Sequence, residues 1–170
     1  MLTFRNIAIA QILLWLIALL QNGYYWQHLP EQVATHFNAA GKADDWMHRD
    51  SATLMMVGFQ TLMPLIFLGI AYSIYFIPSH LINIPNREYW LSPPRREASL
   101  SFVARSTAAF SLAISLFFLG MNHLTFIANR NDGNLKPLGF GLLLGSFLAF
   151  TMSWICVLLL RFRIPKNLNA

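Results

Sequence analysis

Histidine and acidic side chains gather in one short stretch of the sequence, between positions 29 and 46. His36 is followed eight and nine residues later by Asp44 and Asp45. An imidazole beside carboxylates can bind a zinc-like ion or relay protons, and folding can bring His48 and His123 to the same place. The spacing matches no standard metal-binding pattern, however, and a solvated or internally hydrogen-bonded loop explains the same residues.

Other signatures of catalysis are missing from the sequence. It has no phosphate-binding glycine loop, no HExxH motif and no pair of cysteines, since Cys156 is its single cysteine. We therefore expect no metal site and no cofactor, and we assign no catalytic residue.

The same stretch has the composition of a shaped surface loop. Pro30 restrains Leu29 to an extended conformation, and Gly41 is free to adopt a positive φ in a turn. We expect this loop to bind a partner or a ligand. The residues of this predicted recognition site are Pro30, His36, Phe37, Gly41, Asp44, Asp45 and Trp46.

Long uncharged windows dominate the rest of the chain. Its 170 residues are 56% hydrophobic and only 11% charged, whereas soluble domains have roughly 25% charged residues. Four windows each reach the roughly 20 residues that a helix needs to cross a bilayer. They predict an all-α fold, a single domain over residues 1–170 that forms an integral membrane bundle of four transmembrane helices. The predicted spans are 7–26, 52–77, 106–128 and 138–160.

The distribution of basic residues predicts the orientation. Four spans place both termini and the connection 78–105 on one side, and the loop 27–51 on the other. Eight Lys and Arg residues lie on the first side and four on the second, so we expect both termini to be cytoplasmic. These flanks also explain the net charge of +5, and we expect no binding to nucleic acid. The eight residues are Arg5, Arg87, Arg95, Arg96, Arg105, Arg161, Arg163 and Lys166.

The connection 78–105 is the second motif-rich segment. Three prolines predict that it is not a continuous helix. Its arginines surround Tyr89 and Trp90, which indicates either an anchor at lipid headgroups or a docking site for a partner or an anionic ligand. The residues assigned to partner or lipid binding are Asn83, Pro85, Asn86, Arg87, Tyr89, Trp90, Arg95 and Arg96.

Small residues recur at every fourth position of the last span. This spacing places them on one helix face, where they permit close approach of another helix. We favour packing within the bundle over a dimer face. Besides the lipid bilayer, the expected partner is another protein or a second copy of the chain. The four small residues are Gly141, Gly145, Ala149 and Ser153.

The loop between the first two spans resembles that of a bacterial membrane-protein family of unknown function, with the pattern LPxxVxxHFxxxGxxDxW between two transmembrane helices. It is also similar to the N-terminal part of SdpI-type immunity proteins. The resemblance covers about residues 8–100 and includes the segment 83–96. The matching loop positions are Leu29, Pro30, Val33, His36, Phe37, Gly41, Asp44 or Asp45, and Trp46.

The resemblance implies a multi-pass protein of the bacterial inner (plasma) membrane. The family has no established catalytic activity, so no catalytic residue carries over. SdpI-type members have further helices and are linked to toxin resistance and to sequestering a repressor. We therefore expect an SdpI-like immunity, signalling or accessory subunit that recognises a partner through residues 29–46 and 83–96. One alternative is a membrane enzyme or metal-dependent protein that uses His36, Asp44 and Asp45. A second is a small transport subunit, although the spans contain no carboxylate or arginine for ion coupling.

Overall fold

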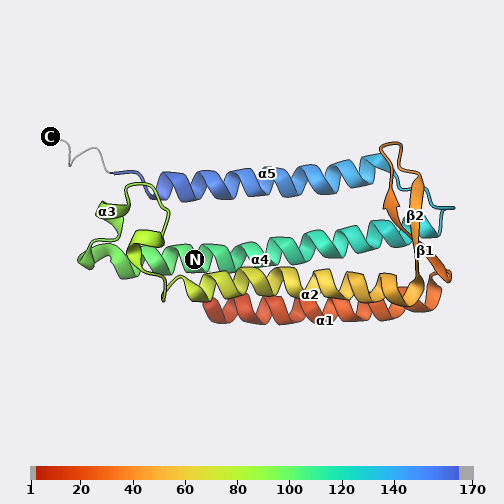
Figure 1. Ribbon diagram of the computed structural model, residues 1–170, viewed down its shortest axis with the longest axis horizontal. Coiled ribbons are helices and arrows are strands. Elements are labelled where there is room, and N and C mark those ends of the chain that lie inside the picture. Colours follow the sequence, from red (N-terminus) through yellow and green to blue (C-terminus); the bar gives the residue numbers. More distant parts are fainter. Residues whose placement is uncertain (1–2, 165–170) are drawn as a thin grey trace.

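The computed structural model describes residues 3–164, which form four long helices and one β-hairpin (Figure 1). Among the described residues, four helices are long and apolar enough to cross a membrane, as predicted. The prediction of an all-α fold is wrong in one respect, because the segment 32–48 forms an antiparallel hairpin. The elements are α1 (Phe4–His28), β1 (Gln32–Phe37), β2 (Ala43–His48), α2 (Arg49–Ser73), the 3-10 helix η1 (Ser79–Leu81), α3 (Arg87–Trp90), α4 (Pro93–Asn129) and α5 (Pro137–Arg161).

The third long helix departs most from its predicted bounds. α4 begins at Pro93 rather than at residue 106. Pro93 and Pro94 occupy its first positions, where a missing N–H costs nothing, so two prolines that were expected to interrupt a helix instead begin one. At 1.5 Å per residue its 37 residues extend about 55 Å, far beyond the roughly 30 Å of hydrocarbon in a bilayer. The first part of α4 therefore projects from the bundle.

The four long helices form two layers. Helices α1, α2 and α4 pack against one another, whereas α5 packs along α4 alone among the described helices and strands. Figure 1 shows α5 on the opposite side of α4 from α1 and α2. Aromatic rings join the α4–α5 seam, with Phe110 of α4 against Phe150 and Trp154 of α5 at centroid distances of 5.9 and 4.6 Å. Helix α4 is thus the element that all the others share.

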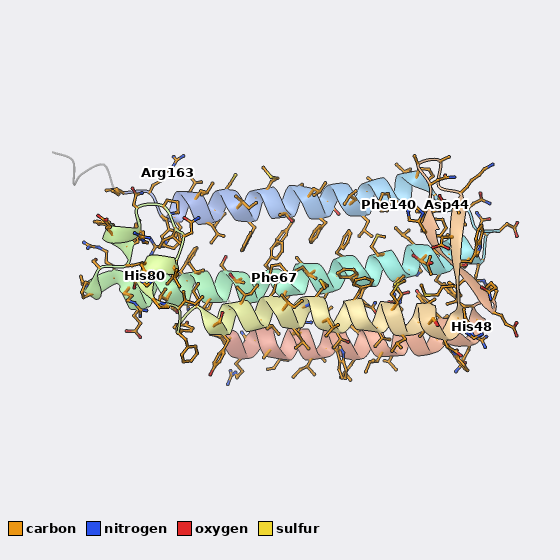
Figure 2. The ribbon with its side chains drawn as sticks, in the orientation of Figure 1. Asp44, His48, Phe67, His80, Phe140 and Arg163 are labelled. Atoms are coloured by element: carbon orange, nitrogen blue, oxygen red, sulfur yellow. The ribbon has the colours of Figure 1, made fainter. Side chains whose placement is uncertain are left out.

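The two ends of the bundle differ. Both ends of the described chain lie together at one end, here called the termini end, and the hairpin lies at the other, the hairpin end (Figure 1). Figure 2 shows His80 and Arg163 at the termini end, Asp44 and His48 at the hairpin end, and Phe67 between them. Of the basic residues predicted to share one side, Lys166 lies outside the described residues. The other seven belong to the segments at the termini end: Arg5, Arg87, Arg95, Arg96, Arg105, Arg161 and Arg163.

Four side-chain amides meet inside the three-helix bundle and form what we call the amide network. On α2, Gln60 is only 4% exposed; it accepts a hydrogen bond from Nδ2 of Asn22 (2.5 Å) and donates one to Oε1 of Gln21 (3.1 Å). On α4, Nδ2 of Asn122 donates to both α1 amides at 3.1 Å. The network ties all three helices together in one register, because an amide in hydrocarbon finds partners only in protein.

The small residues on α5 do not contact another helix. Gly141, Gly145, Ala149 and Ser153 are all exposed, and a Cβ atom added at either glycine would meet no atom within 4 Å. Packing within the bundle, the use favoured from the sequence, is therefore not what the structure shows for this face. The close approach of α4 and α5 instead occurs at Gly120, where an added Cβ would lie 2.9 Å from the side chain of Leu143.

Replacing Gln60 tests the amide network. Gln60→Leu removes its bonds to Asn22, Gln21 and the backbone carbonyl of Phe118, and we expect the free energy of unfolding in detergent to fall by about 1 to 2 kcal/mol. Denaturation in mixed micelles measures this change. Gln27→Leu, at an exposed position of α1, is the control and should stay close to the wild type. Equal stability of the two variants would contradict the structural role of the network.

Candidate functional site

The hairpin tip is shaped by one asparagine. The side-chain Oδ1 of Asn38 accepts hydrogen bonds from the backbone N–H groups of Ala40 and Lys42, at 2.9 and 3.1 Å. Its backbone N–H donates to the carbonyl oxygen of Lys42 at 2.9 Å. An asparagine that bonds to the backbone two residues ahead stabilises a tight turn, so the tip is a defined structure and not a loose loop.

One edge of the hairpin is held by the end of α4. Asn129 presents its amide to the backbone of Ala34, accepting from its N–H at 2.7 Å and donating to its carbonyl at 3.0 Å. This pair of bonds imitates a neighbouring strand, and Ala34 is fully buried. The open edge of β1 is therefore occupied by a side chain at this position, which also protects it from pairing with other chains.

The tip is held by the turn between α4 and α5. The backbone N–H of Leu135 donates to the carbonyl of Gly41 at 2.8 Å, and the N–H of Ala43 donates to the carbonyl of Gly133 at 2.9 Å. Gly41 has φ +77°, and a Cβ there would lie 2.3 Å from the carbonyl oxygen of Leu135. The sequence-based expectation of a positive φ at Gly41 is confirmed, and the close approach to the turn is a second reason for glycine.

The base of the hairpin is held by the ends of α1 and α2. The indole N–H of Trp26 donates to Oδ1 of Asp50 at 2.7 Å, and the guanidinium of Arg49 lies 4.7 Å from the centre of the Trp26 ring. Arg49 also donates to the carbonyl oxygen of Leu29 at 3.3 Å. The hairpin is thus fixed at its base, its edge and its tip by residues from α1, α2, α4 and the turn between α4 and α5.

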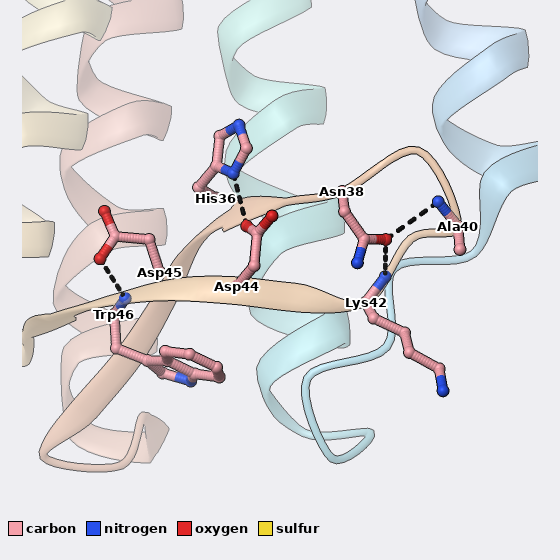
Figure 3. A network of polar contacts seen from close by, with 7 residues as sticks. All are labelled: His36, Asn38, Ala40, Lys42, Asp44, Asp45 and Trp46. Atoms are coloured by element: carbon pink, nitrogen blue, oxygen red, sulfur yellow. Dashed lines mark hydrogen bonds and ion pairs between the residues drawn. The ribbon is translucent and has the colours of Figure 1, made fainter.

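The surface left uncovered by these contacts carries most of the predicted recognition residues. Nδ1 of His36 lies 2.5 Å from Oδ1 of Asp44, with 69% and 43% of the two side chains exposed. Asp45 turns back on its own strand and accepts from the N–H of Trp46 at 2.9 Å. The Trp46 side chain is free, since the residue is 53% exposed. Figure 3 shows its ring on the other side of β2 from the two carboxylates.

The two other histidines considered from the sequence do not join His36 and Asp44. His48 pairs with Gln32 at the base of the hairpin, where its Nδ1 accepts from the N–H of Asp50 at 3.3 Å. Nδ1 of His123 lies 2.5 Å from the hydroxyl of Tyr25, and Tyr25 stacks on Phe126 with ring centroids 3.8 Å apart. Within residues 3–164, no three His, Cys, Asp or Glu side chains are placed to hold a metal ion. The structure therefore brings together His36 and Asp44, but it does not assemble the larger cluster considered from the sequence.

A hollow of about 330 Å³ lies beside the hairpin, where it meets the first residues of α5. Phe37, Met121 and Phe140 provide apolar walls, while His36 and Asn38 provide polar atoms. The exposed imidazole therefore borders an apolar surface on one side and water on the other. Phe37, which was predicted to bind a partner directly, is half-buried and forms part of this wall.

At the termini end, the segment 83–96 folds back on its own chain. Nδ2 of Asn86 and Nε1 of Trp90 both donate to the carbonyl oxygen of Phe162, at 2.8 and 2.9 Å. The guanidinium of Arg161 lies 4.5 Å from the centre of the Trp90 ring. These contacts, which we call the α5 clamp, satisfy a carbonyl at the end of α5 that has no partner within the helix. Asn86 and Trp90 therefore have a structural role that the sequence did not reveal.

The residues that position the hairpin were largely missed from the sequence. Asn129 stands at the end of an apolar span, where polar residues are common and indicate no particular role. Its partner, Ala34, is 95 positions away in the sequence. Trp26 and Arg49 were not among the site residues predicted from the sequence. Local sequence contains no signal for such long-range pairs. The exposed residues His36, Asp44, Asp45 and Trp46 were proposed from the sequence because the stretch 29–46 combines groups that can titrate and accept hydrogen bonds.

Comparison with known families identifies a domain in this part of the chain. The model of a domain of unknown function, DUF1648, matches residues 13–61, which include most of α1, the whole hairpin and the first half of α2. Neither the curated proteins nor the solved structures include a match. Together with the four apolar helices, the match indicates a multi-pass membrane protein that contains a domain of unknown function.

Replacing Asn129 tests how the hairpin is held. Asn129→Ala removes both bonds to the backbone of Ala34, and we expect amide hydrogen exchange in residues 32–37 to quicken by about tenfold, since a buried backbone group without its partner costs about 1 to 3 kcal/mol. Exchange measured by mass spectrometry in detergent gives the rate. Asn131→Ala, at an exposed position in the following turn, is the control. If exchange in β1 is the same in both variants, the side chain of Asn129 does not hold the strand.

Proposed function

We propose that this chain is a non-enzymatic protein of the bacterial inner membrane, with both termini in the cytoplasm and the hairpin outside. The charges support this orientation. Described segments at the termini end carry seven Arg residues and two acidic ones, whereas the hairpin end carries four basic and five acidic residues. Basic residues are retained on the cytoplasmic side of membranes.

We further propose that the hairpin recognises a protein or peptide partner in the external aqueous phase. The observation that carries this proposal is Trp46, a large aromatic residue that is 53% exposed and whose ring projects from β2 on the side opposite the carboxylates (Figure 3). Exposed tryptophan on a rigid support is a frequent centre of binding energy in interfaces. His36, Asp44 and Asp45 add exposed polar groups on the other side of β2 (Figure 3), and Pro30 is exposed at the start of the hairpin.

The resemblance of this loop to SdpI-type immunity proteins favours an immunity, signalling or accessory role over a free-standing enzyme. In that proposal the hairpin is the part of the protein that meets the partner. The segment 83–96 would act on the cytoplasmic side, mainly by securing α5. The guanidinium of Arg95 lies 4.1 Å from the centre of the Tyr89 ring, and Nε of Arg96 donates to Oγ of Ser79 at 3.2 Å. These contacts within the chain support a structural role for both arginines.

Labelling of single cysteines tests the orientation. In a Cys156→Ser background, Lys42→Cys at the hairpin tip should react with a membrane-impermeant maleimide in intact cells. Glu88→Cys, at the termini end, should react only after the membrane is permeabilised. Both positions are exposed, so accessibility within the protein does not limit the reaction. Equal labelling of both positions in intact cells would refute the proposed topology.

Substitution of the exposed tryptophan tests the recognition surface. A photo-crosslinking amino acid at Lys42 should capture a partner in intact cells, and Trp46→Ala should weaken this capture by about 30-fold, the effect of losing about 2 kcal/mol at an interface centre. Leu138→Ala, another exposed apolar side chain at the same end, is the matched control. Unchanged capture in the Trp46→Ala variant, with the hairpin still protected from exchange, would exclude Trp46 as the centre of the site.

A further inference from the structure

A second hollow lies far from the hairpin, on the seam between α4 and α5. It is a groove of about 470 Å³ lined almost entirely by apolar side chains. Ala109, Leu112 and Leu116 form its α4 wall, and Leu143, Ser146 and Phe150 belong to its α5 wall. The contact between Gly120 and Leu143 brings the two helices together just beyond the groove on the hairpin side. From this contact the groove runs toward the termini end as far as Ala109 and Phe150.

Arg105 stands below the groove on the same face of α4. Positions 105, 109, 112 and 116 follow the spacing of a single helix face, so the arginine precedes the apolar wall by one turn. Its Nε donates to the backbone carbonyl of Ser101 at 3.2 Å, which directs the side chain toward the termini end. Among the described residues it forms no ion pair with an acidic group. The guanidinium is half-buried and keeps donors free for an anion.

The depth of Arg105 corresponds to a membrane surface. One turn above it, Ala108 packs in a buried layer with Ile7 near the start of α1 and Ala71 near the end of α2. Arg105 thus lies level with the ends of two spanning helices, where hydrocarbon gives way to headgroups. From Arg105 to Leu116 the helix rises about 16 Å, which is close to half the roughly 30 Å thickness of the hydrocarbon.

We infer that the groove between α4 and α5 binds one anionic phospholipid from the leaflet at the termini end, with an acyl chain along the apolar walls and the phosphate at Arg105. Three features of the structure match this occupant and its orientation. The groove is apolar, and together with the turn of α4 that leads to Arg105 it extends over about half the thickness of the hydrocarbon. Arg105, a cation without an acidic partner among the described residues, stands at its headgroup end, and the surrounding segments are strongly basic. The inference rests on the membrane insertion proposed above but not on recognition by the hairpin.

Binding of a defined lipid to the purified full-length protein tests this site. Dioleoyl-phosphatidylglycerol titrated into detergent-solubilised protein should give a one-to-one complex by native mass spectrometry, at concentrations where dioleoyl-phosphatidylcholine does not. Arg105→Gln should weaken the complex at least about fivefold, and Arg105→Lys should restore most of it. Arg163→Gln, a basic position at the same end but away from the groove, should bind as the wild type does.

Filling the groove gives an independent readout. Ser146→Trp places a large ring within it and should abolish the one-to-one complex. Leu148→Trp, which the helical spacing places on the opposite face of the same helix at a position that is 52% exposed, should leave the complex intact. An equal loss in Arg105→Gln and Arg163→Gln would mean unspecific attraction of charge, and a change of oligomeric state in Ser146→Trp would mean that a second chain occupies the groove. Either result overturns the proposal of a lipid site. If Trp46→Ala loses partner capture but still binds the lipid, the result bears on recognition by the hairpin and leaves the lipid site unaffected.

Discussion

Side-chain amides buried among apolar helices impose the constraint on which this fold depends. Gln21, Asn22, Gln60 and Asn122 come from three helices and bond to one another. In apolar surroundings these amides cannot form hydrogen bonds with water instead. Sliding or rotating one helix would therefore leave several donors and acceptors without partners at once. Apolar packing alone would tolerate several registers, because an apolar helix surface is solvated about as well by lipid tails as by the leucine side chains of another helix.

Fixing the helices also fixes the hairpin. The network includes Asn122, and two turns further along the same helix Asn129 holds the backbone of β1. The base of the hairpin joins the last turn of α1 to the first turn of α2 through Trp26, Arg49 and Asp50. A short two-stranded ribbon is marginally stable by itself, so these attachments explain how it holds a defined shape. The exposed Trp46 is thereby presented on a rigid support.

The sequence was a good guide to the helices and a partial guide to the site. Hydrophobic length identified all four spans, because the requirement to cross a bilayer is a property of local composition. Pro93 and Pro94 were predicted to interrupt a helix but instead occupy the first positions of α4. Proline disrupts the interior of a helix and is well tolerated in its first turn. The strands of the hairpin escaped clear prediction because His36, Asp44 and Asp45 do not alternate with apolar residues, and the register contains shifts near His36. Side chains that act over 95 positions, such as Asn129 on Ala34, leave no local pattern.

The loose attachment of α5 has a consequence for how the molecule is made. Helices α1, α2 and α4 complete their mutual hydrogen bonds without any residue beyond 129, and α5 has no buried residue of its own. During translation the first three long helices can therefore associate while the last is still within the ribosome. The final helix then joins a finished assembly, guided at one end by the Gly41–Leu135 bond and at the other by the carbonyl of Phe162. In biogenesis, the core of α1, α2 and α4 would accordingly form first, and α5 would be added to it afterwards.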